Sequence, residues 1–258
     1  MNRLENQIAV ITGSDSGIGQ ATAIEMAGEG ASIAILYHED ADGAETTRKQ
    51  VIAAGGRAIV MQGDIGKEAD VEQLFSRCER EMGTATILVN CAGVDAGGIC
   101  VEDMTLESWE AALRTNLTGP FLTCRRFIKT LSREKKPGKI VNVTSVHQQI
   151  PRAGAAEYDS SKGGLMNLTT TLALELAPQK INVNNLAPGM VLTPMNQKAI
   201  DDPKYLEEQV QSIPWKRAAQ PSEIAKLAVY LSSADADYIT GATFMIDGGL
   251  TINTGQGA

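Results

Sequence analysis

A tyrosine and a lysine spaced for one helix face stand out among the residues that could do chemistry. Tyr158 and Lys162 are four positions apart, and Ser145 precedes Tyr158 by thirteen residues, at the end of an apolar run. Side chains four apart on a helix are neighbours, so this spacing sets a phenol beside an ammonium group. A cation about 4 Å away, at an effective dielectric of about 20, favours the phenolate by roughly 4 kcal/mol and lowers a tyrosine pKa of about 10 by up to about three units.

The pair predicts a proton-transfer site. With its pKa lowered, Tyr158 could give or take a proton near neutral pH, while Ser145 holds the same substrate oxygen. The helix that this requires is indicated by an apolar stripe at helical spacing, made of Leu165, Leu168, Leu172 and Leu176. A surface tyrosine and lysine on an ordinary helix would show the same spacing, so the rest of the chain has to decide.

The elements that would position these residues begin with a glycine-rich turn. An apolar run over 8–12 predicts a strand, and it opens into Gly13, Gly17 and Gly19 before a helical stretch that reaches about residue 30. Glycines suit a backbone that turns tightly against a ligand, and the helix N-terminus that follows offers N–H groups to a diphosphate. A plain turn is the alternative, but the place directly after the first strand favours dinucleotide binding.

A second strand, predicted over 31–37, ends where a dinucleotide-binding fold meets the adenosine ribose. A carboxylate there accepts from the 2′-hydroxyl, and an arginine pairs with a 2′-phosphate. Here His38 and Glu39 follow the strand, with no arginine or lysine at the position. Glu39 and Asp15 would repel a 2′-phosphate, and His38 is mostly neutral at pH 7. We therefore expect NAD to be preferred over NADP, though not exclusively.

The same alternation continues along the whole chain. Further apolar runs at 57–62, 86–90, 139–144, 180–186 and 241–246 alternate with amphipathic helical segments, without a repeat or a break in composition. The pattern predicts one α/β domain over 1–258, a doubly wound Rossmann fold with a seven-stranded parallel sheet and helices on both faces. The carboxyl ends of its strands should bring together the glycine turn, Asp64, Asn90, Ser145 and Pro188.

Two segments depart from this alternation. A long helical region over 103–133 contains Asn116, whose amide is out of place in a helix interior. It either serves the active site or fills a local backbone gap near Gly119 and Pro120. An irregular segment over 190–214 is too long for a connector, so we expect it to form a substrate flap.

Composition narrows the function classes. The net charge is −8, so no basic excess is available to bind a phosphate backbone, and neither nucleic acid nor a membrane is expected as a partner. The first residues lack signal-peptide or transit-peptide character, and no apolar stretch approaches the roughly 18 residues of a membrane span, so we expect a cytoplasmic protein. Four scattered cysteines and two histidines indicate neither disulfides nor a metal site.

The motifs together resemble the short-chain dehydrogenase/reductase family over essentially the whole chain. Its T-G-x-x-x-G-I-G turn matches 12–19, its N-x-A-G motif matches 90–93, and its helix asparagine matches Asn116. Pro188, Gly189 and Thr193 stand where the family contacts the nicotinamide. The resemblance implies an NAD(P)-dependent enzyme that transfers hydride between a substrate carbon and the nicotinamide.

The resemblance also implies a role for each polar residue. Tyr158 would be the general acid or base, and Lys162 would lower its pKa and bind the nicotinamide ribose. Ser145 would orient the substrate hydroxyl, and Asn116 would maintain a water-linked proton route. The implied cofactor contacts are Gly13, Asp15, Ser16, Gly17, Ile18, Gly19, Tyr37, His38, Asp64, Ile65, Asn90, Ala92, Gly93, Tyr158, Lys162, Pro188, Gly189, Val191 and Thr193.

Several stretches are similar to the bacterial glucose 1-dehydrogenases of this family, namely 145–151, 161–164, 187–189 and 247–251. This implies oxidation of an aldose such as glucose at C1 to the lactone. Besides Ser145 and Tyr158, the sugar hydroxyls would meet Asp95, His147 and Asn196. Asp95 stands where those enzymes typically carry glutamate.

Other assignments stay open. A 3-oxoacyl or other ketone reductase of the same family is the second hypothesis, and a non-catalytic dinucleotide-binding regulator is the third. His38 stands where glucose 1-dehydrogenases typically carry arginine, which bears on the cofactor. The family implies a homotetramer, and the helices expected over 103–133 and 157–177 carry more apolar residues than one sheet face can cover.

Overall fold

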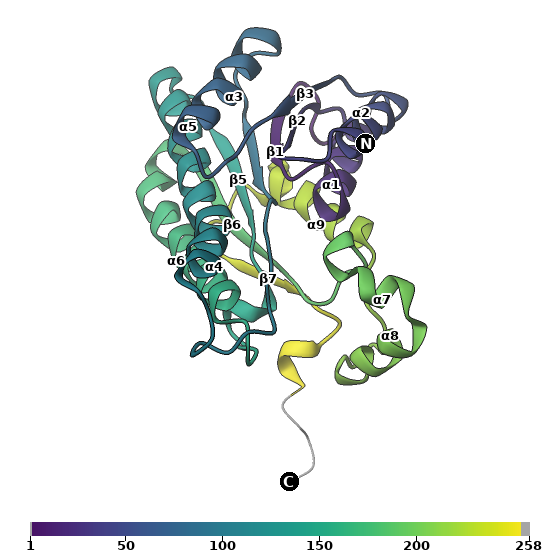
Figure 1. The fold of residues 1–258 in the computed structure, drawn as a ribbon. Coiled ribbons are helices and arrows are strands. Elements are labelled where there is room, and N and C mark those ends of the chain that lie inside the picture. The colour runs from purple at the N-terminus through teal and green to yellow at the C-terminus, as the bar shows by residue number, and fades with distance from the viewer. Residues whose placement is uncertain (1, 254–258) are drawn as a thin grey trace.

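A parallel sheet of seven strands forms the centre of the computed structural model, which describes residues 2–253. The strands are β1 Ile8–Thr12, β2 Ser32–Tyr37, β3 Ala58–Gln62, β4 Ile87–Asn90, β5 Gly138–Val143, β6 Ile181–Pro188 and β7 Thr243–Ile246. Their order is β3-β2-β1-β4-β5-β6-β7, and every neighbouring pair is parallel (Figure 1). The predicted doubly wound sheet is confirmed. The first residue and the last five of the expected domain lie outside the described residues.

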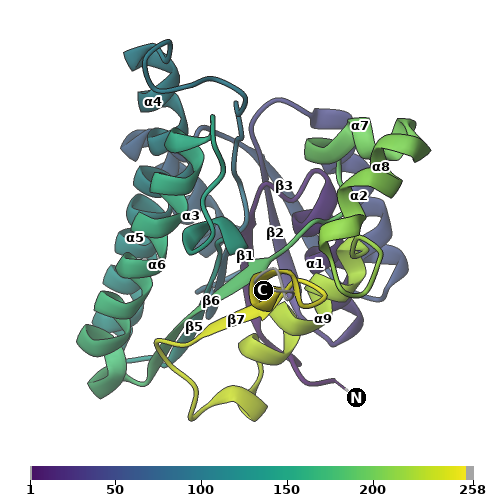
Figure 2. The same cartoon turned by 90° about the horizontal axis from the view of Figure 1, so that it is seen from below.

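Helices cover both faces of the sheet, as predicted. In Figures 1 and 2, one layer lies on each side of the strands. One contains α1 Gly17–Gly28, α2 Ala41–Ala53 and α9 Pro221–Ser232, and the other contains α3 Glu68–Glu81, α4 Leu106–Leu113, α5 Gly119–Glu134 and α6 Ala156–Leu176. The strand order reverses between β1 and β4, which opens a crevice at their carboxyl ends.

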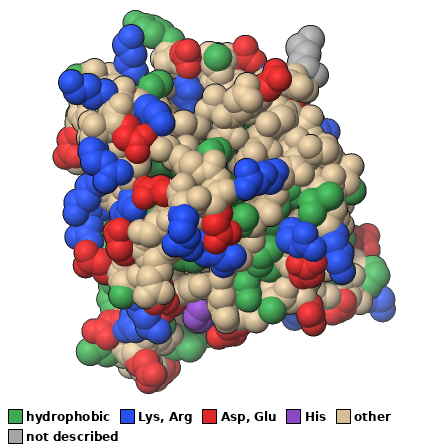
Figure 3. All heavy atoms as spheres, turned by 90° about the horizontal axis from the view of Figure 1, so that it is seen from above, with side chains coloured by type: hydrophobic (Ala, Val, Ile, Leu, Met, Phe, Trp, Pro, Cys, Tyr) green, Lys and Arg blue, Asp and Glu red, His purple; other side chains and the backbone are tan. Residues whose placement is uncertain are grey.

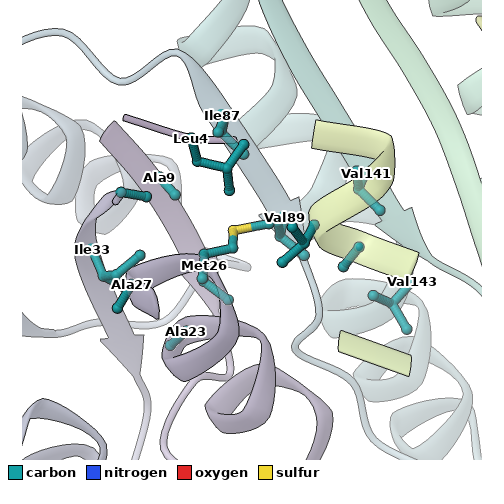
Figure 4. Packing of buried hydrophobic residues seen from close by; sticks show 14 of the residues in the cluster. Leu4, Ala9, Ala23, Met26, Ala27, Ile33, Ile87, Val89, Val141 and Val143 are labelled. Carbon is teal, nitrogen blue, oxygen red and sulfur yellow. The ribbon is translucent and has the colours of Figure 1, made fainter. Parts of the chain in front are cut away.

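The core beneath α1 fixes the start of that helix below the crevice. Met26 is fully buried and points toward Val89 of β4 (Figure 4). Ala23 and Ala27 flank it on the same helix and are also buried, so small side chains let α1 approach the sheet. Burying a side chain as large as methionine contributes about 1.5–3 kcal/mol.

The helix predicted over 103–133 is interrupted. Between α4 and α5, Arg114–Thr118 forms a turn of π-helix that contains the buried Asn116. The Asn116 Oδ1 accepts from the Val94 N–H at 2.8 Å, and its Nδ2 donates to the Val94 carbonyl at 2.8 Å. The amide therefore binds the loop after β4 rather than a gap in its own helix. Such π-turns inside α-helices are frequent at functional sites.

The segment over 190–214 is largely helical rather than irregular. It contains a 3₁₀ turn at Pro194–Asn196, then α7 Gln197–Asp201 and α8 Pro203–Gln209. The Asp202 carboxylate caps α8 by accepting from two backbone N–H groups, and a proline takes the first helical position. These capping residues were a sequence signal for a helix. Figure 1 shows α7 and α8 projecting from the sheet beside α9.

Candidate active site

A cleft of about 970 Å³ runs along the carboxyl edge of the sheet. It lies where the strand order reverses, which is where doubly wound sheets bind their ligands. The predicted site residues that line it are Gly13, Asp15, Ser16, Gly17, Ile18, Gly19, Tyr37, His38, Asp64, Ile65, Ala92, Gly93, Asp95, Ser145, His147, Tyr158, Lys162, Pro188, Gly189, Val191, Thr193 and Asn196. Asn90 and Asn116 do not line it.

Gly13 and Gly19 in the glycine turn have no room for a side chain. Gly13 has a φ of +61°, and a Cβ placed on Gly19 would lie 2.1 Å from the Gly13 carbonyl oxygen. At the start of α1, Ser16 makes no side-chain cap, and Ser16, Gly17 and Ile18 line the cleft. The first N–H groups of the helix are therefore available at the cleft, which fits the diphosphate of a dinucleotide.

Acidic side chains surround the end of β2. The Asp40 carboxylate accepts from the Gly43 N–H at 2.8 Å and so caps α2. Asp15 lines the cleft at the glycine turn, and burial raises its pKa. The side chains of His38 and Glu39 are 64% and 87% exposed, with 3.6 Å between the His38 Nδ1 and the Glu39 Oε1. Glu39 is thus the carboxylate at this strand end that is free to meet a ribose.

The structure brings the predicted catalytic side chains together. Tyr158, Lys162 and Ser145 are all buried and line the cleft. The Lys162 Nζ lies 5.5 Å from the Tyr158 ring centroid and donates to the Val143 carbonyl at 2.9 Å. The Ser145 hydroxyl accepts from the His147 N–H at 3.1 Å, and Ser145 also lies close enough to the Tyr158 phenol to lower its pKa.

The expected lowering of the Tyr158 pKa is not found. Burial raises the pKa of Tyr158 to about 12, and the nearby Ser145 side chain offsets only part of this. Burial likewise lowers the pKa of Lys162 to about 8. The ammonium is directed at the Val143 carbonyl, so its attraction for the phenolate is weaker than the spacing suggested. Desolvation, which disfavours the charged form of both groups, dominates.

Asn116 supports this centre from behind the cleft. Its Nδ2 also donates to the Ser161 hydroxyl of α6 at 3.1 Å, so one amide joins the catalytic helix to the loop after β4. A Cβ on Gly93 would lie 3.3 Å from the Asn116 Oδ1 and 3.5 Å from the Lys162 Nζ. Both residues therefore approach the backbone at Gly93.

The Asn90 side chain lies inside the protein and not in the cleft, which differs from the prediction. Its Nδ2 donates to the Asn142 Oδ1 at 2.8 Å, and its Oδ1 accepts from the Thr123 hydroxyl at 2.6 Å. A buried amide needs partners for both of its ends, and these two satisfy it. Asn90 ties β4 to β5 and α5.

Charged groups line the end of the cleft beside Tyr158. The Asp95 Oδ2 accepts from the Arg152 Nη2 at 2.9 Å, and the Arg152 guanidinium carbon lies 5.1 Å from the Tyr158 ring centroid. The His147 Nδ1 lies 2.9 Å from the Ile150 carbonyl, which assigns the proton to Nδ1 and leaves Nε2 as an acceptor. Burial lowers the pKa of His147 and so favours the neutral ring.

Arg152 is a residue of this site that the sequence did not predict. It lines the cleft from the loop between Ser145 and Tyr158, directly after Pro151. The available signal was its place between two expected catalytic residues. Asn196, which was predicted, lines the cleft and donates one amide N–H to the Val191 carbonyl at 2.8 Å, so its second N–H and its Oδ1 are left for a ligand.

The described residues 2–253 contain no further kind of site among those that metal-binding groups, disulfides or membrane-spanning helices would form. No group of three or more His, Cys, Asp or Glu side chains in that range is placed to hold a metal ion, and its four cysteines are free. None of the helices there has the length and apolar content needed to cross a membrane. On the face shown in Figure 3, acidic and basic side chains are interspersed.

Comparisons with known proteins agree on the family and differ on the substrate. The family model described as "Enoyl-(Acyl carrier protein) reductase" matches residues 13–251. "Glucose 1-dehydrogenase 2" of Bacillus subtilis is 35% identical over 98% of both chains. A "3-oxoacyl-[acyl-carrier-protein] reductase" of Synechocystis is also 35% identical, over 98% of this chain and 100% of that protein.

A solved structure shows the same fold. The gluconate 5-dehydrogenase of Burkholderia cenocepacia, in complex with NADP and tartrate, superposes with a TM-score of 0.90 at 31% identity, covering 97% of each chain. The match to the family model, the near full-length relatives and the catalytic geometry agree. The chain therefore belongs to the short-chain dehydrogenase/reductase family, whose members are oxidoreductases that use NAD or NADP.

Proposed function

We propose that this oxidoreductase oxidises the anomeric carbon of an aldose, with glucose as the first candidate, and releases the lactone. The observation that carries the proposal is the polar wall beside Tyr158. Asp95, Arg152 and His147 present acceptors and donors there. A polyol satisfies such groups, whereas an apolar ketone would leave them unpaired at a cost of about 1–3 kcal/mol each.

The side chains around the cleft divide the chemistry between them. Ser145 holds the anomeric oxygen beside Tyr158, whose phenolate form takes the hydroxyl proton while C1 gains its second bond to that oxygen. The ring oxygen of the sugar supports the positive character that develops at C1. When bound, the nicotinamide supplies the acceptor for the hydride that leaves C1. Lys162 binds the nicotinamide ribose. Asn116 maintains the water-linked proton route of the same centre.

A panel of aldoses and polyols, each with NAD and with NADP, tests the proposal. Formation of reduced nicotinamide is followed by absorbance, and the product is identified as the lactone. We expect turnover with at least one aldose and much less with its 1-deoxy analogue. Turnover of ketones with reduced cofactor, and of no aldose, would establish the ketone reductase instead.

That second function is favoured by one relative. The 3-oxoacyl reductase of Synechocystis is as similar to this chain as the Bacillus subtilis glucose enzyme. A reductase that receives substrate from an acidic carrier protein benefits from a basic surface at the mouth of its site. Here Glu107 and Glu110 line the cleft with Arg114, a mixed set of charges. A regulator that only binds the dinucleotide would have no chemical need for Ser145 and Tyr158.

NAD is the cofactor that we propose to be preferred. Glu39 is free at the end of β2, and Asp15 lines the cleft beside it, so a 2′-phosphate would meet carboxylates. Replacing His38 with arginine should move the kcat/KM ratio toward NADP. A wild-type kcat/KM that is higher with NADP would contradict this preference.

Two further proposals concern the rest of the chain. The segment over 190–214 acts as a flap, since Met195, Asn196 and Tyr205 line the cleft from it. The protein assembles into a homotetramer, because α5 and α6 expose Phe121 at 45% and Leu174 at 83%. Light scattering at micromolar concentration tests the second proposal, which a monomer would contradict.

A further inference from the structure

We infer that Arg152 is a specificity-determining residue, which together with Asp95 binds the hydroxyl group next to the carbon that is oxidised, so that the site selects a vicinal diol unit of a neutral polyol. The inference rests on the proposed function, because it names the substrate class of the same site. It concerns a pair of side chains, one from the loop after β4 and one from the loop before α6, and the chemistry that such a pair recognises.

The pair lies beside the reacting centre. The Arg152 guanidinium carbon is 5.1 Å from the Tyr158 ring centroid, and the Arg152 Nη2 is 2.9 Å from the Asp95 Oδ2. Both residues line the main cleft together with Ser145 and Tyr158. A group bound between them is therefore close to the carbon whose hydroxyl meets Tyr158.

The two loops are fixed to each other before any substrate binds. The backbone N–H groups of Gly98 and Ile99 both donate to the Gly154 carbonyl, at 2.7 Å and 3.1 Å. The Arg152 N–H donates to the Asp159 Oδ2 at 2.6 Å, which anchors the arginine to the first turn of α6. A preorganised pair binds a ligand with little ordering cost.

The pair keeps hydrogen-bonding capacity that a diol can use. The Asp95 Oδ1 accepts from the Gly97 N–H at 3.1 Å and its Oδ2 from Arg152, and each carboxylate oxygen has room for another donor. The Arg152 side chain is 37% exposed, and the only hydrogen bond that its guanidinium donates among residues 2–253 goes to Asp95, so further N–H donors are left for a ligand. A neighbouring hydroxyl can donate to the carboxylate and accept from the guanidinium, so it matches the pair in both directions.

The charges near the pair favour a neutral ligand. Arg152 is already balanced by Asp95, and the Asp159 Oδ1 lies 3.8 Å from its Nη2. Glu107 and Glu110 line the same cleft. An anionic substrate would meet these carboxylates, and an apolar substrate would leave the ion pair facing hydrocarbon.

There is space for the rest of a polyol beyond the pair. A smaller cavity of about 310 Å³ is also lined by Asp95 and Arg152, together with Gly97, Gly98 and Ala153. Met195 of the 190–214 segment borders it as well. Small side chains on these loops leave the volume open to a hydroxylated chain or ring.

The test compares substrates that differ by one hydroxyl. We measure kcat/KM for glucose against 2-deoxyglucose, and for butane-2,3-diol against butan-2-ol, in the wild type and in Arg152→Met. An unpaired buried group costs about 1–3 kcal/mol, so the wild type should prefer the diol member by about 5- to 150-fold. Arg152→Met keeps apolar bulk over the Tyr158 ring, and its preference should fall below about threefold at an unchanged KM for the cofactor.

Controls separate recognition from folding. Arg80 on α3 is exposed and pairs only loosely with Glu81 at 3.5 Å, so Arg80→Met should keep the wild-type preference. The double variant Asp95→Asn/Arg152→Gln retains a neutral hydrogen-bonding pair and should fold while losing the diol preference. Arg152→Lys should restore the preference in part, because it returns the charge without the planar fork.

A failure of this inference can be told apart from a failure of the proposed function. Turnover of glucose with the same diol preference in wild type and Arg152→Met overturns this inference and leaves the function intact. A diol preference that depends on Arg152, without turnover of any aldose, supports the inference and rejects the sugar. A wild type that shows no preference between the members of either pair also overturns the inference.

Discussion

At the glycine turn the ligand-facing groups belong to the backbone, whereas beyond Tyr158 they are charged and polar side chains on loops. The glycine turn offers N–H groups of α1 and excludes any side chain at Gly19. The end of the cleft beyond Tyr158, where we propose that the substrate binds, offers Asp95, Arg152 and His147 from loops after β4 and β5. Backbone N–H groups bind the diphosphate, which all dinucleotides share. Side chains on loops can be replaced by other residue types without disturbing the fold.

This difference explains the comparisons. Relatives at 35% identity include proteins named for a sugar and for an oxoacyl substrate, over nearly the same length of chain. The fold and the Tyr158 centre are compatible with both names. The side chains beyond Tyr158 are where such proteins can diverge, so tests of the substrate have to address that end of the cleft.

The largest effect on turnover is expected from a substitution of Tyr158, where the two ends of the cleft meet. Tyr158→Phe deletes the transferable proton and little volume, so turnover should fall by about 10²- to 10⁴-fold, as for loss of a general acid or base. The Kd for the cofactor, measured by fluorescence titration, should change little. Retention of more than about a tenth of the activity would remove Tyr158 from the mechanism.

The glycine turn should be intolerant of even one methyl group. In Gly19→Ala the new Cβ would lie 2.1 Å from the Gly13 carbonyl oxygen, so the turn must shift. Overpacking of this kind costs about 1–3 kcal/mol, and we expect cofactor affinity to fall by about 5- to 150-fold. Gly28→Ala is the matched control in the same helix, since its Cβ would meet nothing within 4 Å. Equal affinities in the two variants would contradict a backbone-built site.

Lys162 should make stability depend on pH. Its folded pKa of about 8 lies below the ordinary 10.5, so the folded protein carries the cost of a buried charge at pH 7. That cost disappears as pH rises from 8 toward 10.5, because the folded state gives up its proton first. The stability of the wild type relative to Lys162→Met should therefore rise by up to about 3 kcal/mol over that range. Urea unfolding of both proteins at pH 7 and pH 10 measures it, and a constant difference would argue against a buried ammonium.

Variants of the two histidines should show that the two ends of the cleft bind different ligands. His147→Ala removes an acceptor at the substrate end, and one hydrogen bond is worth about 0.5–1.5 kcal/mol, so KM for the sugar should rise by about 2- to 13-fold. The KM for the cofactor should stay constant. His38→Ala is the matched variant at the other end and should affect only the cofactor. A change in both constants for both variants would mean that the two ends are not independent.

Local motifs explain what the sequence could predict. The seven apolar runs, the glycine turn and the spacing of Tyr158 and Lys162 each depend on neighbours in the chain, and the structure contains all of them. The capped α8 was equally local, since Asp202 and Pro203 mark its start. It was missed because the segment was interpreted by its length alone.

What the sequence could not predict depends on burial and on contacts between distant segments. The pKa of Tyr158 is raised by desolvation, a quantity that four-residue spacing does not contain. The Asn90 side chain donates a hydrogen bond to Asn142, 52 positions away in the sequence, and therefore does not line the cleft. The role inferred for Arg152 depends on its ion pair with Asp95, which lies 57 positions away in the sequence. An arginine in a loop belongs to no periodic pattern that could predict this contact.

The central claim is that hydride leaves the anomeric carbon while Tyr158 takes the hydroxyl proton. Glucose with deuterium at C1 tests it most directly, by its kcat/KM against unlabelled glucose and against glucose with deuterium at C2. We expect slower turnover with the C1 label alone and transfer of that deuterium to the nicotinamide. Transfer of deuterium from another carbon, or reduced cofactor that contains none of the C1 label, would contradict the account.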